Sequence, residues 1–167
     1  MNKIIFNLLI LFFLLFSNNP NANELLLYAD NISYDSNKNI IAKGNAKIIK
    51  GGEIITSDLI IYNSQNKSII IPTKFTYRDS INNYYLGTSG KFDNDMNNGE
   101  IENVKILLND GTRIVGKKVI RRDEIDIINK GVYTQCKSRI NIKDFVCPIW
   151  QLEGVKILHD YDNLFLY

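Results

Sequence analysis

The sequence contains few of the residues that most often carry catalysis or bind metals, since its 167 residues include one His and two Cys. It also has no excess of one charge, because 20 Lys and Arg balance 18 Asp and Glu to a formal charge of +2. A surface that binds nucleic acid needs basic residues gathered on one face, so no nucleic-acid partner is expected. Apolar residues make up 45% of the chain, which excludes wholesale disorder.

One long hydrophobic run is present, and it lies at the N-terminus. Residues Ile4 to Phe16 are apolar except for Asn7, and a polar stretch over residues 17–23 follows. As a helix this run would rise about 20 Å, short of the roughly 30 Å hydrocarbon core of a bilayer. The pattern predicts a signal peptide over residues 1–22 and a mature domain over residues 23–167 in an oxidising extracytoplasmic space. An uncleaved anchoring segment is the alternative.

The rest of the chain has the pattern of short strands. From Leu25 onward apolar and polar residues alternate, no window has a sustained helical period, and turn residues recur about every dozen residues. The turn Asn109-Asp110-Gly111 lies between two apolar stretches, which predicts a tight hairpin. Pro72 predicts an edge or a bulge because it cannot donate a ladder hydrogen bond. The predicted fold class is all-β.

An imperfect repeat of 28 to 30 residues organises these strands. Residues Asp30 to Asp35 recur 28 residues later as Asp58 to Asn63, and the strand that follows matches at an offset of 29. Weaker copies begin near Gly90, Lys117 and Gly154. Two interpretations fit the repeated apolar face: the core of an ordinary antiparallel sandwich, or the lining of an elongated sheet folded on itself.

Signals for an enzyme are nearly absent. The only histidine, His159, has no nucleophile at an informative spacing. Gly87 to Lys91 partly matches a phosphate-binding loop, but Phe92 occupies the position where Ser or Thr should follow the lysine. Carboxylates such as Asp123, Glu124 and Asp126 are interpreted as solvated loop residues. We therefore expect neither catalysis nor a cofactor.

Two cysteines, Cys136 and Cys147, are eleven residues apart. In an oxidising compartment a disulfide is the first interpretation, and closing a loop of this length would contribute about 3 kcal/mol. Zinc binding together with His159 lacks the usual close spacing of ligand pairs. The segment interrupts the repeat, which indicates an inserted feature rather than a strand pair.

The only basic cluster contains Lys117, Lys118, Arg121 and Arg122. Strict alternation places Lys117 and Arg121 on one face and Lys118 and Arg122 on the other. One interpretation is that the cluster is a solvated strand end with no functional role. The functional hypothesis is contact with phosphate groups of an anionic ligand.

Several of these segments resemble a known family. Residues Ala29 to Asp35 and Ala42 to Ile48 resemble the repeat of the OstA-like periplasmic domains of lipopolysaccharide (LPS) transport. The later segments, in order, resemble the N-terminal domain of the LPS-assembly protein LptD of the alphaproteobacterial type, and they are Gly99 to Val104, Asn109 to Arg113, Tyr133 to Cys136 and Pro148 to Leu152. The resemblance covers essentially the whole mature chain.

The resemblance implies an antiparallel β-jellyroll, or β-taco, which is a V-shaped sheet whose interior holds the acyl chains of lipid A without chemistry. It also implies a location in the periplasm at the outer membrane, and docking of a periplasmic bridging protein to an edge strand. Holding a dozen carbons out of water is worth about 10 kcal/mol. The residues expected to contact the lipid are Ile40, Ala42, Ala46, Ile48, Ile69, Ile71, Phe75, Tyr77, Val104, Ile106 and Leu108.

The sequence departs from this family at its C-terminus, where members continue into an outer-membrane barrel. We expect a barrel that is encoded separately, or a truncated product. In the family, cysteines of this domain can pair with cysteines near the barrel, which is a second hypothesis for Cys136 and Cys147. Two functional alternatives remain: an interaction protein that docks by strand addition and carries nothing, and a non-functional fragment of a split gene.

Overall fold

The computed structural model describes residues 24–136, 139–142, 145–148, 150–161 and 165–166. The signal peptide expected over residues 1–22 lies outside them. All fifteen elements of the described residues are strands, and none of these residues forms a helix long and apolar enough to cross a bilayer. The all-β prediction is confirmed.

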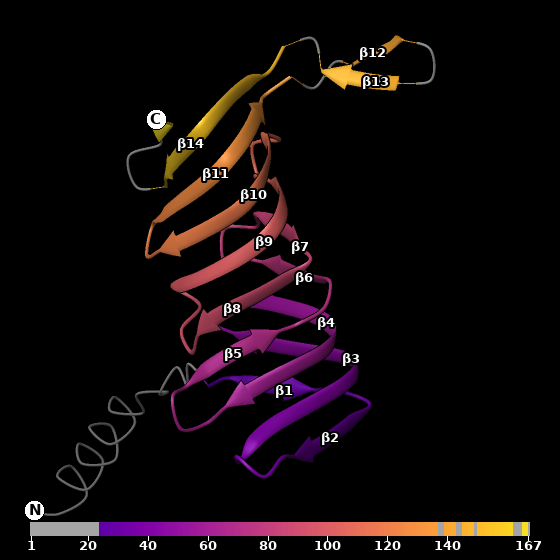
Figure 1. Ribbon diagram of the computed structural model, residues 1–167, viewed down its shortest axis with the longest axis vertical. Helices are drawn as coiled ribbons and strands as arrows, with labels where there is room; N and C mark the ends of the chain where they lie inside the picture. The colour runs from indigo at the N-terminus through magenta and orange to yellow at the C-terminus, as the bar shows by residue number, and fades with distance from the viewer. Residues whose placement is uncertain (1–23, 137–138, 143–144, 149, 162–164, 167) are drawn as a thin grey trace, which may run out of the picture.

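Thirteen of the strands form one antiparallel sheet, and β12 and β13 form a separate hairpin. Figure 1 shows the strands stacked along the long axis of the molecule, from β2 at one end to β14 near the other. The bounds are β1 Leu26–Tyr28, β2 Asn31–Tyr34, β3 Asn39–Lys50, β4 Glu53–Asn63, β5 Ser68–Ile71, β6 Phe75–Arg78, β7 Tyr84–Gly87, β8 Ser89–Asp93, β9 Asn98–Leu107, β10 Arg113–Arg122, β11 Ile125–Thr134, β12 Arg139–Ile142, β13 Phe145–Pro148, β14 Leu152–Asp160 and β15 Phe165–Leu166.

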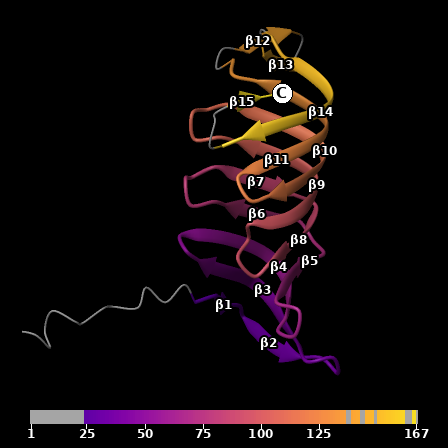
Figure 2. The same ribbon diagram turned by 90° about the vertical axis from the view of Figure 1, so that its left-hand side faces the viewer.

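Each strand of the stack is bent or broken near its middle, at a line that we call the crease. β1 and β2, β5 and β6, and β7 and β8 are the halves of broken strands, whereas β3, β4, β9, β10, β11 and β14 run through. On one side of the crease β1, β6, β7 and the adjoining half-strands form the first wall. On the other side β2, β5, β8 and their adjoining halves form the second wall. Figure 2 shows β6 and β7 on one side of the stack and β5 and β8 on the other.

Left-handed backbone conformations accompany the crease in β3, β9 and β11. The β3–β4 ladder shifts register between Lys43 and Ala46, where Gly44 and Asn45 have φ of +76° and +46°. Asn103 of β9 and Lys130 of β11 also lie in the left-handed region, at φ of 48° and 50°. A residue in this conformation leaves the ladder and turns the strand.

Pro72 lies at the crease, between the end of β5 and the start of β6. Because proline has no N–H to donate, the strand breaks there. The prediction of a bulge is close to what is found, but the prediction of an edge is wrong, since β5 and β6 pair on both sides with β4, β7 and β8.

The crease also explains the period of the repeat. Asp30 and Asp58, which begin the first two copies, lie at the crease of successive strands that run in the same direction. Each copy therefore comprises two bent strands. The predicted hairpin at Asn109-Asp110-Gly111 is confirmed, because β9 pairs with β10 across it and Gly111 has φ of +89°.

The bend changes which residues are buried. Within each half-strand buried residues alternate, but across the crease the step is three residues, as in Ser57 to Ile60 and Ile101 to Val104. β10 steps likewise from Gly116 to Val119. A side chain after the crease therefore faces the opposite way from the one that strict alternation predicts.

The segment between the cysteines also differs from its prediction. It is an insertion, but residues 139–142 and 145–148 form the strand pair β12–β13, which stands apart from the sheet (Figure 1).

Candidate functional site: the interior between the two walls

The eleven residues predicted to contact lipid lie on β3, β5, β6 and β9 or directly after β9. Ten of them are buried in the core between the walls, and Ile40 is half-buried. The sequence pattern therefore located the inner face correctly in these strands. Contact with a lipid stays a prediction.

The interior also includes apolar residues that the sequence analysis did not select. Ile55 and Ile60 of β4 are fully buried, and so are Tyr85, Phe92 and Ile101 of the next strands. Together with residues further along the stack they extend the apolar face from β3 to β14. Ile55 and Ile60 were missed because the step of three at the crease interrupts their alternation.

The inner faces of the two walls pack directly on each other. Phe75 of the first wall and Phe92 of the second make an edge-to-face contact with ring centroids 6.0 Å apart. Tyr77 of the first wall also contacts Phe92, at 5.4 Å. In the described structure the core side chains therefore fill this interior themselves.

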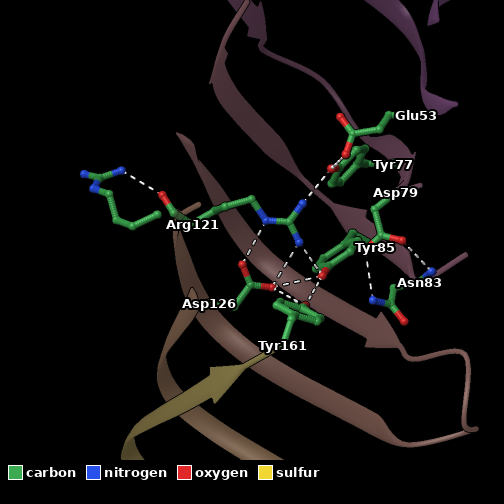
Figure 3. A network of polar contacts seen from close by, with 9 residues as sticks. Glu53, Tyr77, Asp79, Asn83, Tyr85, Arg121, Asp126 and Tyr161 are labelled. Carbon is green, nitrogen blue, oxygen red and sulfur yellow. Dashed lines mark hydrogen bonds and ion pairs between the residues drawn. The ribbon is translucent and has the colours of Figure 1, made fainter. Parts of the chain in front are cut away.

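A polar cluster joins the two walls inside this apolar interior (Figure 3). Arg121 of β10 binds Asp126 of β11 through Nε–Oδ1 and Nη2–Oδ2 distances of 3.0 and 3.2 Å. Its Nη1 donates to the Tyr77 hydroxyl at 2.6 Å, and its Nη2 donates to that of Tyr85. Tyr85 and Tyr161 donate to Asp126 at 2.9 and 2.7 Å. We call these five residues the clasp, because Tyr77 and Tyr85 belong to the first wall and the other three to the second.

Arg121 and Asp126 of the clasp remain charged although both are buried. Burial opposes the charge of Asp126, but the charge of Arg121 and the hydrogen bonds that Asp126 accepts hold its pKa below the ordinary value of 3.8. Burial likewise opposes the charge of Arg121, and Asp126 keeps the pKa of Arg121 well above its usual range. Burial raises the pKa of Tyr77, Tyr85 and Tyr161, so the three hydroxyls are neutral donors.

A second contact joins the walls farther from the crease. Lys50 at the end of β3 is buried and donates to Asp95 at 2.5 Å and to the Asn94 carbonyl at 3.0 Å, both in the turn before β9. Glu53 also lies at this margin and accepts a hydrogen bond of 2.9 Å from Tyr77. The clasp and the contacts of Lys50 thus both join the two walls.

The structure separates the predicted basic cluster. Arg121 points inward to the clasp, whereas Lys117 is exposed on the opposite face because the crease lies between them. Lys118 is paired with Glu100 at 2.6 Å and with Glu102 at 3.4 Å. Arg122 is exposed and donates to the Arg121 carbonyl at 2.9 Å. Phosphate contact by these residues stays a prediction, but the four do not form one surface.

Two further predictions concern carboxylates and histidine. Asp126 is fully buried on a strand, so its interpretation as a solvated loop residue is wrong. Asp126 lies two residues before the apolar Ile128, and this alternation was the sequence signal that its side chain faces inward. The His159 and Tyr161 ring centroids are 4.3 Å apart, and the buried Nδ1 of His159 has no hydrogen-bond partner among the described residues. No group of three or more metal-binding side chains occurs among the described residues.

The predicted disulfide involves a side chain that the structure does not describe. Cys136 is half-buried just after β11, and Cys147 lies on β13, where only the backbone is described. Both hypotheses for these cysteines stay predictions.

Both ends of the stack present apolar side chains. Ile32 and Tyr34 on β2 are exposed, Tyr34 by 74%, and β2 pairs with β3 alone. At the other end Leu152 and Val155 on β14 are exposed, Val155 by 85%, beyond the residues that pair with β15. Unpaired edges with apolar side chains are surfaces on which another strand can add.

An antiparallel sheet of bent strands, stacked into an elongated roll around an apolar interior, defines the class of this protein as a β-jellyroll. A solved structure with this fold is LptH of Pseudomonas aeruginosa, described as the LptA-homologous periplasmic component of the conserved LPS transport device. The two align with a TM-score of 0.56 and 11% identity over 78% of this chain and 96% of LptH. The sequence matches no protein-family model and no curated protein. The fold implied by the OstA-like resemblance is thus present.

Proposed function

We propose that this chain is a non-catalytic, LPS-binding conduit module of periplasmic LPS transport. The observation that carries the proposal is the apolar interior, which continues along the stack from β3 to β14. The fold shared with an LPS transport component supports the same role.

In its finer form the proposal gives the chain the role of the LptD N-terminal domain at the outer membrane. LPS would arrive from the periplasmic bridging protein and leave to an outer-membrane barrel. The exposed apolar edges at β2 and β14 support docking by strand addition at both ends.

Acyl chains would be held between the walls, against the eleven residues predicted to contact lipid. Because those walls pack on each other, lipid insertion requires them to separate and the clasp to break. Burial of about a dozen methylenes, at roughly 0.8 kcal/mol each, contributes about 10 kcal/mol in favour of that separation. The clasp would then close the interior when no lipid is bound.

Photo-cross-linking tests the proposal directly. The full chain is produced with its own N-terminal segment in an LPS-containing bacterium, with a photoreactive phenylalanine analogue in place of Phe75. The matched control has the analogue at Leu107, which is exposed on the outer face of β9. LPS adducts at position 75 and none at position 107 are expected. Adducts at neither position, in protein that is folded by circular dichroism, would refute the proposal.

The exposed edges favour one further candidate, a docking protein that carries no lipid. The same analogue at Tyr34 or Val155 would then cross-link to a protein partner, while position 75 gives no lipid adduct. This pairing of outcomes separates the two functions.

A further inference from the structure

The outer surface of the first wall carries a groove that the proposed function does not use. Its volume is about 690 Å³, and it lies beside the crease on the outer faces of β3, β4, β6, β7 and β9. This surface is opposite to the apolar interior, since strand residues alternate between the two faces. The lining also includes Ala46 and Phe75, which are buried in the core, so the floor of the groove is the wall itself.

Three lysines from distant parts of the sequence line the groove: Lys47, Lys74 and Lys105. None of the three makes an ion pair or a side-chain hydrogen bond within the described part of the chain. Lys50 and Lys118, by contrast, have carboxylate partners. Asp58 is the only carboxylate in the lining, so the groove has an excess of positive charge.

The lysines are spaced along the groove rather than clustered. Lys47 and Lys105 occupy the two ends of one cross-strand ladder, with Thr56, Thr76 and Leu86 between them. Four strand spacings separate the ends, which is about 19 Å. Lys47, Thr76 and Lys105 follow each other at intervals of 29 residues, so the sequence repeat itself aligns these three positions.

Hydrogen-bonding groups and one apolar side chain fill the space between the lysines. Thr56 and Thr76 supply hydroxyls that bind each other, and the Thr88 hydroxyl donates to the Glu102 carbonyl at 3.2 Å and accepts from the Asn103 amide at 3.1 Å. Each hydroxyl oxygen keeps acceptor capacity, and the Asn103 carbonyl oxygen is a further acceptor. Leu86 is half exposed on the same surface. Hydroxyls and amides match the hydroxyl groups of sugars, an apolar side chain matches the C–H face of a sugar ring, and lysines match phosphate or carboxylate substituents.

We infer that this groove binds an acidic oligosaccharide, with its phosphate or carboxylate groups at Lys47, Lys74 and Lys105. An extended ligand fits because the positive charges are far apart. The inference does not rest on LPS transport, since the lysines, hydroxyls and amide on which it depends belong to the outer side of the first wall.

Titration of the full chain with tetragalacturonate, which has a carboxylate on every ring, tests the inference. Saturable binding is expected, with shifts of the backbone amide signals of Thr76 and Leu86 and a weaker affinity at higher salt. Maltotetraose, which is neutral, and inorganic phosphate, which is too short, are each expected to bind at least tenfold more weakly.

The double variant Lys47→Gln/Lys105→Gln should weaken tetragalacturonate binding at least tenfold. The matched control Lys91→Gln/Lys156→Gln removes two exposed lysines outside the groove and should leave the affinity unchanged. Equal losses in both variants, or equal binding of maltotetraose, would overturn the inference. Tighter binding of a hexaglutamate peptide would assign the groove to an acidic peptide and also overturn it. Lipid cross-linking from position 75 should be the same in both double variants, so the two proposals fail separately.

Discussion

Arg121 and Asp126 form the only ion pair of the described residues in which both side chains are buried, with 7% and 1% of their side-chain surfaces exposed. In each of the other ion pairs of these residues, the carboxylate side chain is at least 42% exposed. Removing one member of a buried pair leaves an unpaired charge in an apolar interior, whereas replacing both members need not destabilise the fold.

The clasp gives the first prediction. Arg121→Met or Asp126→Asn should each lower the free energy of unfolding by about 3–5 kcal/mol in urea titrations. The double variant Arg121→Met/Asp126→Leu should recover part of that loss, because no buried charge remains although Tyr85 and Tyr161 lose a hydrogen-bond acceptor. Lys118→Met, which breaks an exposed pair, should cost about 0–1 kcal/mol. Single variants no more costly than Lys118→Met would contradict a buried, ionised clasp.

Glu53 gives a prediction for pH. Burial raises the pKa of this half-buried carboxyl above 4.5, and the hydrogen bond from Tyr77 opposes the shift only in part. The folded state thus holds the proton more readily than the unfolded chain, so the contribution to stability is full below pH 4.5 and is lost as pH rises through the folded-state pKa. Glu53→Gln should therefore be more stable than the parent at pH 7, and the difference should shrink toward pH 4.5.

The control for Glu53 is Glu100→Gln. The hydrogen bond from Lys118 lowers the pKa of the exposed Glu100, so this substitution should not stabilise the protein at pH 7. Urea titrations at several pH values measure both effects. A gain at pH 7 in Glu100→Gln equal to that in Glu53→Gln would rule out burial as the cause.

Gly116 tests the packing of the interior. A Cβ at this position would lie 2.3 Å from Cγ2 of Ile128, so Gly116→Ala should destabilise the fold by about 1–3 kcal/mol. Gly154→Ala, where the nearest atom is 3.1 Å away on the side chain of Ile157, should cost less. Thermal unfolding of both variants makes the comparison, and equal losses would mean that the interior is loosely packed.

Lys130 tests the conformation of the crease. Its φ of 50° is strained for a residue with a side chain, so Lys130→Gly should raise the free energy of unfolding by about 0.5–1 kcal/mol. Lys91→Gly, at an exposed position of β8, should lower it by about the same amount. A loss of stability in Lys130→Gly would show that the left-handed conformation of Lys130 is not strained.

Alternation predicted the inner face of β3 because the bulge at Gly44 and Asn45 leaves Ala42 and Ala46 facing the same way. The same rule failed in β10, where the step of three turns Lys117 outward and Arg121 inward. The three-residue steps have no uniform signature in the hydrophobic pattern, because the residues skipped are Asp58 and Leu59 in β4 but two lysines in β10. The clasp was therefore out of reach from sequence: Arg121 stood out as part of a basic cluster, but its partners come from β6, β7, β11 and the turn after β14.

Every bent strand belongs to both walls, so no single cut of the backbone divides the protein into one wall and the other. The covalent chain crosses the crease in each continuous strand and thereby prevents the walls from sliding past each other. Rotation about the crease is the movement that remains. Because neighbouring strands are hydrogen-bonded on both sides of that line, rotation of one strand turns its neighbours as well, and the interior opens along its length as a cooperative unit.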